Sequence, residues 1–133
     1  MSKYSLWVVL LFCNSLCIGA ENISLSCRGV AEYASQSAKD GKMTYSKKEN
    51  EVESFIFEDE RLVSKNLKID CNWSNEKITC LKLDAKPNGM DVSVFVDRIT
   101  GAVDTTTVLR NGKGDVIWRR MFSGECESKK RKF

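Results

Sequence analysis

The cysteines are the residues with the clearest chemistry in this chain, and the sequence contains no histidine to work beside them. An amino-terminal leader, described below, removes two of the six cysteines and leaves Cys27, Cys71, Cys80 and Cys126. Without histidine, the commonest general base and the catalytic triads built on it are absent. A zinc site is disfavoured as well, because none of these four cysteines has a partner at C-x₂₋₄-C spacing. An even number of cysteines in an exported chain predicts disulfides, and we expect no metal and no cofactor.

The leader, residues 1–20, has the pattern of a secretory signal peptide. Lys3 supplies the positive charge, Leu6 to Phe12 is an unbroken apolar run, and Gly19 and Ala20 offer small residues for cleavage. A membrane anchor is the alternative, but Asn14 interrupts the run well short of the ~20 residues that a spanning helix needs. The sequence therefore predicts export to the periplasm or out of the cell.

A predicted hairpin selects one of the three pairings that four cysteines allow. Leu67 to Trp73 alternates between apolar and polar residues, and Ile78 to Leu83 returns after a short polar turn. If Asn75 and Glu76 are the two loop residues, residues 71 and 80 face each other at a non-hydrogen-bonded position, where Cα atoms lie about 4.5 Å apart. That separation suits a disulfide between Cys71 and Cys80.

The remaining two cysteines, Cys27 and Cys126, would then tie the beginning of the mature chain to its end. In the chain-entropy model this long loop contributes about 4.7 kcal/mol, against about 2.7 kcal/mol for the ten-residue hairpin loop. A bond between the first and last strands also brings together the two strands that must meet if a sheet closes into a barrel.

The C-terminal third, Asp91 to Cys126, predicts three strands joined by tight turns. Valines alternate with other residues over Val92 to Val96, and Val103 to Leu109 is rich in Thr and Val. The turns between strands are expected at Asp97-Arg98-Ile99-Thr100-Gly101 and at Asn111-Gly112, where glycine can adopt a positive φ. On the last strand, Val116 to Phe122, Trp118 and Arg120 share one face with Phe122.

Earlier in the chain, Ile23 to Tyr33 alternates cleanly, with Gly29 marking a bulge or a bend. Gln36 to Asn50 is polar and predicts a loop, with Met43 to Ser46 as a short edge strand at most. Glu51 to Phe57 predicts a further strand, followed by a charged turn. The whole pattern predicts an all-β fold, a small antiparallel up-and-down barrel of seven or eight strands tied by disulfides. Residues 21–128 would form this domain, and residues 129–133 a basic tail.

The charge of the mature chain is nearly balanced. Without Lys3, 20 basic residues face 18 acidic ones, and the four basic residues of the tail offset an otherwise slightly acidic domain. We therefore expect no nucleic-acid partner. An anionic membrane or lipopolysaccharide surface is a weaker alternative, for which the candidate contacts are Arg119, Arg120, Lys129, Lys130, Arg131 and Lys132. The competing interpretation of the tail is a solvated terminus.

In several of these features the chain resembles a group of small exported bacterial proteins of unknown function. The shared features are an early cysteine, a D-R-x-T-G hairpin and a terminal G-x-C, carried here by Cys27, Gly29, Asp97, Arg98, Thr100, Gly101, Gly124 and Cys126. The resemblance implies a small periplasmic β-barrel without a known activity. It covers the two ends of the mature chain and does not include the Cys71–Cys80 hairpin.

The sequence favours a monomeric, non-catalytic binding protein whose partner is a protein or a component of the cell envelope. Asp97, Asp104 and Glu125 are the candidates for a two-carboxylate enzyme, the least favoured alternative. Arg98 beside Asp97 predicts an ion pair within the turn. The aromatic residues are numerous enough to fill a small barrel, so we expect a solid core. The alternative is a hollow barrel that carries one small apolar ligand, as in lipocalins.

Overall fold

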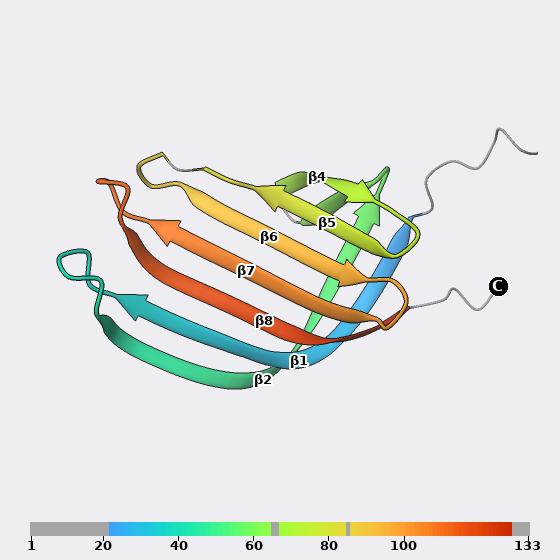
Figure 1. Ribbon diagram of the computed structural model, residues 1–133, viewed down its shortest axis with the longest axis horizontal. Helices are drawn as coiled ribbons and strands as arrows, with labels where there is room; N and C mark the ends of the chain where they lie inside the picture. Colours follow the sequence, from blue (N-terminus) through green and yellow to red (C-terminus); the bar gives the residue numbers. More distant parts are fainter. Residues whose placement is uncertain (1–21, 65–66, 85, 129–133) are drawn as a thin grey trace, which may run out of the picture.

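The computed structural model describes residues 22–64, 67–84 and 86–128. Within them the chain forms eight antiparallel strands, each paired with the next, and the last returns to pair with the first (Figure 1). The strands are β1 (Ile23–Gln36), β2 (Met43–Glu58), β3 (Arg61–Ser64), β4 (Leu67–Trp73), β5 (Lys77–Lys82), β6 (Met90–Asp97), β7 (Ala102–Arg110) and β8 (Val116–Ser128). This closed order confirms the predicted all-β, up-and-down, disulfide-tied barrel.

Pairing of β1 with β8 closes the ring, in an unbroken register that runs from Leu25 opposite Ser128 to Ser35 opposite Trp118. Cys27 lies directly opposite Cys126, and a disulfide joins them with their Cα atoms 3.9 Å apart. The ring is therefore closed by backbone hydrogen bonds and by a covalent bond at the same place.

The second disulfide joins Cys71 and Cys80, whose Cα atoms lie 4.2 Å apart across the β4–β5 hairpin. Trp73 pairs with Ile78, and the amide of Ser74 donates to the carbonyl oxygen of Lys77 at 2.9 Å, which leaves Asn75 and Glu76 in the turn. Both disulfide pairings and the hairpin register that selected them are thus confirmed.

Two glycines face each other on the seam between β1 and β8. Gly29 lies opposite Gly124, two residues along from the disulfide on each strand. A Cβ atom added to Gly29 would overlap the carbonyl oxygen of Ser123, and one added to Gly124 would overlap that of Arg28. The sequence allowed a β-bulge at Gly29, but the continuous register between β1 and β8 excludes it. Glycine is required here because the two backbones approach too closely for a side chain.

The strands differ in length, so the ring is not evenly closed. β2 has 16 residues and β3 only four. Within the described residues, β2 pairs with β3 only from Ile56 to Glu58, although it pairs with β1 along almost its whole length. From Met43 to Phe55, one edge of β2 is therefore not covered by β3, and Figure 1 shows this part of β2 extending away from the β3–β4 side.

The long β2 corrects the sequence prediction for residues 36–50. This segment was expected to be a loop with a short edge strand, but Met43–Glu58 is one continuous strand. Residues 41–50 are all exposed, so no apolar alternation marks them as a strand. Their strand conformation comes from backbone pairing with β1, where Tyr33 lies opposite Lys47. A single six-residue connection, Ser37–Lys42, separates the two strands, and the amide of Ser37 donates to the carbonyl oxygen of Lys42 across it at 2.9 Å.

The predicted turns of the C-terminal meander are present, with one difference in detail. Gly101 has a φ of 80° and ends the β6–β7 turn as expected. The β7–β8 hairpin is longer than a two-residue Asn-Gly turn, and its positive φ, 86°, belongs to Gly114 and not to Gly112. The Oδ1 atom of Asn111 accepts the amides of Lys113 and Asp115, each at 2.9 Å, which stabilises this wider turn.

One end of the barrel is filled by large side chains. Phe57, Phe122 and Ile78 are almost completely buried there, and the ring of Trp73 packs edge-on against that of Phe57 with centroids 5.6 Å apart. This end fits the expectation of a solid core. Among the described residues, no helix has the length and hydrophobicity of a membrane-spanning segment.

The glycine seam gives a direct test of the closure. Gly29→Ala should lower the free energy of unfolding by more than about 2 kcal/mol, because the new methyl group meets backbone that cannot rotate away. Gly112→Ala is the matched control, since its Cβ would lie 3.9 Å from the nearest atoms. Its effect should stay within about 0.5 kcal/mol. Urea unfolding of the oxidised protein measures both, and equal losses would show that the seam is not tightly packed.

Candidate functional site

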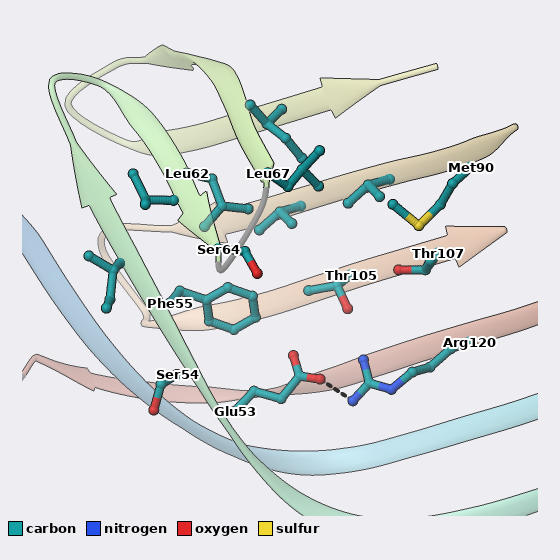
Figure 2. A pocket seen from close by; sticks show the side chains of 15 residues that line it. Glu53, Ser54, Phe55, Leu62, Ser64, Leu67, Met90, Thr105, Thr107 and Arg120 are labelled. Atoms are coloured by element: carbon teal, nitrogen blue, oxygen red, sulfur yellow. Dashed lines mark ion pairs between the residues drawn. The ribbon is translucent and has the colours of Figure 1, made fainter. Parts of the chain in front are cut away.

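The end of the barrel opposite the aromatic cluster is hollow. A cavity of about 720 Å³ lies between β2, β3, β4, β6, β7 and β8. Figure 2 shows its lining side chains converging from these strands on a common space. Most of the lining is aliphatic or aromatic: Phe55, Ile56, Leu62, Val63, Leu67, Ile69, Met90, Val92 and Val94. The solid core expected from the aromatic content therefore occupies only part of the interior.

The hollow follows from the sizes of the side chains on the strands that face it. Val92 and Val94 on β6 and Thr105 and Thr107 on β7 are short, β-branched residues on the cavity wall. Such side chains point straight away from the sheet and are too short to reach the opposite wall of the barrel. At the filled end, phenylalanines take the corresponding inward positions. The interior is therefore filled at one end and hollow at the other because the inward residues change in size along the strands.

The cavity reaches the surface along the uncovered edge of β2. Ser54 and Ile56 both line it, and both are exposed on β2 next to the point where pairing with β3 stops. Ser64 and Leu67 line the same side, at the end of β3 and the start of β4. The cavity is therefore open to solvent between β2 and the described parts of β3 and β4.

A charged cluster forms the polar wall of the cavity. Nη2 of Arg120 lies 2.8 Å from Oε2 of Glu51 and also pairs with Oε1 of Glu53, as the dashed line in Figure 2 shows for the second pair. Nε of Arg120 donates to the hydroxyl of Tyr33 at 3.2 Å, and that hydroxyl donates to Oε1 of Glu51. The Arg120 side chain is only 16% exposed, so these contacts are largely removed from water.

Small residues on β1 allow this cluster to form. Arg120 lies on β8 and the two glutamates on β2, with β1 between them. Gly29 is opposite Glu51 in the β1–β2 register, and the next inward residue of β1 is Ala31. Neither residue has a side chain that blocks the space above β1, so the guanidinium can cross to β2. The glycine seam that closes the ring thus also makes room for its ion pairs.

The two glutamates of the cluster differ in their acid–base properties. The hydrogen bond from Tyr33, followed by that from Arg120, lowers the pKa of Glu51. Burial raises the pKa of Glu53, and the attraction of Arg120 only partly offsets this. Burial alone would lower the pKa of Arg120, but its bonds to Tyr33 and the two glutamates raise it. Arg120 is therefore always a cation, and above the pKa of Glu53 the three charges sum to −1.

Two of the arginines that the sequence offered for anion binding, Arg119 and Arg120, lie on opposite faces of β8. Arg119 and Arg120 alternate on β8, so Arg119 is exposed on the outer surface while Arg120 lies inside and pairs with glutamates. Arg120 is thus not available on the outer surface to an anionic membrane. The tail residues Lys129, Lys130, Arg131 and Lys132, and the leader over 1–20, lie outside the described residues.

The predicted ion pair between Asp97 and Arg98 is wrong. Oδ1 of Asp97 accepts hydrogen bonds from the amides of Thr100 at 3.0 Å and Ile99 at 2.8 Å, which lower the pKa of Asp97 and stabilise its own turn. Arg98 instead donates to the carbonyl oxygen of Ser74 at 2.7 Å and lies over the ring of Trp73. The two side chains diverge because each finds a partner in the backbone of a nearby turn.

The other carboxylates considered for catalysis lie outside the barrel cavity. Asp104 accepts a hydrogen bond from Ser123 at 2.6 Å on the exposed side of β7 and β8. Asp97 and Asp104 border a separate outer pocket of about 370 Å³ that does not include Glu125. The three residues are therefore not gathered at one site.

Glu51, Glu53 and Tyr33 were missed as site residues, although the sequence contains a signal for the glutamates. Both glutamates occupy the same alternating phase of β2 as the buried Phe55 and Phe57. An acidic residue in the inward phase of a strand needs a cationic partner, and Arg120 lies in the inward phase of β8 beside Phe122. Only the register across β1 could show that these residues meet.

Comparison with known proteins found no matching family model, no similar curated protein and no similar solved structure.

The ion-pair cluster predicts a pH-dependent defect in a single variant. Arg120→Met should lower the free energy of unfolding at pH 7 by roughly 1–2 kcal/mol, because it leaves the half-buried carboxylate of Glu53 without its cation. In this variant the folded-state pKa of Glu53, which burial already raises in the unmodified protein, lies further above its unfolded value. The destabilisation is therefore present above those values and is relieved as the pH falls through them.

Arg119→Met is the matched control, since Arg119 is the exposed neighbour on the same strand. Its stability should follow that of the unmodified protein from pH 7 to pH 4. Urea unfolding at several pH values measures the three proteins side by side. A defect in Arg120→Met that does not shrink on acidification would mean that the glutamates are not held by this guanidinium.

Proposed function

We propose that this protein is an exported, non-catalytic binding protein that carries one small amphipathic molecule in its barrel cavity. The observation that carries the proposal is the cavity itself: about 720 Å³, open along the β2 edge, mainly apolar in its lining and charged at one wall. Small-molecule sites in proteins typically measure about 300–1,000 Å³ and combine an apolar lining with a few polar groups. The cavity has both properties.

The lining favours a ligand with a long or compact apolar body. The valine, leucine, isoleucine and methionine side chains of β3, β4 and β6 offer few hydrogen bonds, so a polar molecule would lose its hydration there without replacement. An apolar body instead gains about 0.8 kcal/mol for every methylene group removed from water. Hydrophobic burial would therefore supply most of the affinity.

The same geometry distinguishes this hypothesis from binding of a folded protein partner. Leu67 and Val92 on the cavity wall are half-buried inside the ring of strands, so the surface of another folded domain cannot reach them. A lipid-like component of the cell envelope can. The cavity thus supports the hypothesis of a hollow, lipocalin-like carrier more strongly than that of a protein-binding module. The hypothesis that the basic tail binds anionic membranes concerns residues outside the described part.

Binding without catalysis is the interpretation that the cavity wall supports best. Among the described residues, Glu53 is the only carboxylate that lines the cavity. Glu51 has one oxygen bonded to Tyr33 and the other to Arg120, so it is held in place and does not face the ligand space. A hydrolytic pair of carboxylates needs two groups on either side of the bond that is cleaved. The wall offers one such group.

Export is part of the proposal and is supported by the two disulfides. Disulfides persist in the periplasm and outside the cell and are rare in reducing compartments. We infer that the leader over 1–20 directs the chain to such a compartment and that the ring is then closed by oxidation.

Calorimetric titration of the mature protein with neutral fatty alcohols of increasing length tests the proposed carrier function. Affinity should rise roughly fourfold per methylene, corresponding to about 0.8 kcal/mol, until the cavity is full, and then level off. Thr107→Phe should abolish binding, because Thr107 lines the cavity and the larger ring would occupy it.

Thr106→Phe is the matched control, since Thr106 lies next to it on β7 and does not line the cavity. This variant should bind as the unmodified protein does. If no alcohol binds, or if both variants bind equally well, the barrel is not a carrier of such molecules.

A further inference from the structure

Glu53 has a special position in the cavity, because it is a carboxylate on an otherwise mainly apolar wall and one of its oxygens is not engaged. Oε1 pairs with Arg120, which is the one hydrogen-bond partner of the Glu53 carboxylate among the described residues, so Oε2 has none. Figure 2 shows the second oxygen of Glu53 directed toward the lining side chains rather than toward Arg120. A ligand in the cavity would therefore meet a carboxylate oxygen at this wall.

The charges around this oxygen do not balance. Arg120 is the single cation of the cluster, and it is shared between Glu51 and Glu53. Glu51 uses both of its oxygens, one with Tyr33 and one with Arg120, and is tightly held. The excess negative charge therefore belongs to Glu53, which is also the glutamate that borders the ligand space.

On this basis, and resting on the carrier function proposed above, we propose that the natural ligand is a cationic amphiphile whose ammonium head binds Oε2 of Glu53. An ammonium group would donate a hydrogen bond to the free oxygen and would cancel the excess charge. An anionic head would meet Glu53 in a poorly hydrated space and would have to displace it from Arg120. A neutral hydroxyl would form the hydrogen bond without balancing the charge.

The surroundings of Glu53 make binding of such a head dependent on pH in a defined direction. The charged groups that face Glu53 are Arg120 from β8 and Glu51 from β2. Cys27, opposite on β1, is in a disulfide and does not titrate, and Thr105 and Thr107 from β7 are neutral. Burial raises the pKa of Glu53. The cation should therefore bind more tightly as the pH rises through that pKa, and its advantage should be lost below it.

The test compares three ligands with the same chain and different heads: decylamine, decanol and decanoate, titrated calorimetrically into the mature oxidised protein at pH 7. Decylamine should bind about tenfold more tightly than decanol, as expected for one hydrogen bond between charged groups, and decanoate more weakly than either. Equal affinities of decylamine and decanol, or tighter binding of decanoate, would contradict the proposed cationic head group. Neither result would contradict the proposed carrier function. Failure of all three to bind would contradict the carrier function itself.

Glu53→Gln removes the charge and keeps the shape of the side chain, so the ratio of decylamine to decanol affinity should fall close to one. Glu58→Gln is the matched control, because Glu58 is an exposed residue of the same strand that does not line the cavity. That control should retain the tenfold ratio. An unchanged ratio in Glu53→Gln would contradict the assignment of the head to Glu53.

The pH dependence keeps the proposal testable if Glu53→Gln does not fold. In the unmodified protein, the ratio of decylamine to decanol affinity should decrease as the pH is lowered from 7 to 4, while decanol affinity changes little. Decylamine remains protonated throughout, so the change reports on the protein. A ratio that stays constant over this range would rule out a titrating carboxylate at the head group.

Discussion

Pairing of β1 with β8 closes the barrel, and both the ion-pair cluster and the cavity require that closure. It converts a meandering sheet into a ring, and the Cys27–Cys126 disulfide makes that closure covalent. The same seam contains Gly29, which lets the two backbones approach closely and leaves the space above β1 free. Through that space Arg120 reaches Glu51 and Glu53 on the far side of β1. One local arrangement therefore provides the closure, the ion-pair cluster and the polar wall of the cavity.

Much of the fold could be predicted because its determinants are local in the sequence. Alternation marks the strands that have one buried face, and counting outward from a two-residue turn places Cys71 opposite Cys80. The pairing of Cys27 with Cys126 follows by elimination. This disulfide in turn predicts that the first and last strands lie side by side. The polar half of β2 could not be predicted, because residues 41–50 are exposed and carry no pattern that distinguishes a strand from a loop.

The candidate site was less accessible to prediction, since it depends on registers between strands that are distant in sequence. Arg120 lies 69 residues from Glu51 along the chain, and they meet only because both flank β1 at its smallest residues. The cavity likewise reflects the summed size of inward side chains from six strands, whereas the number of aromatic residues alone suggested a solid core. For Asp97 and Arg98, proximity in sequence was misleading. Their opposite charges do not pair, because each side chain bonds to backbone groups instead.

NMR of the methyl groups can show whether the closed ring of strands has a hollow end that a ligand can enter. In a titration with decanol, the methyl resonances of Leu67, Val92 and Val94, which line the cavity, should shift together with one saturating dependence on concentration. Those of Val30, Val52 and Leu81, which are exposed on the outside, should not move. Shifts at the outer methyls without shifts at the inner ones, or no shifts at all, would contradict the hollow barrel and the function proposed for it.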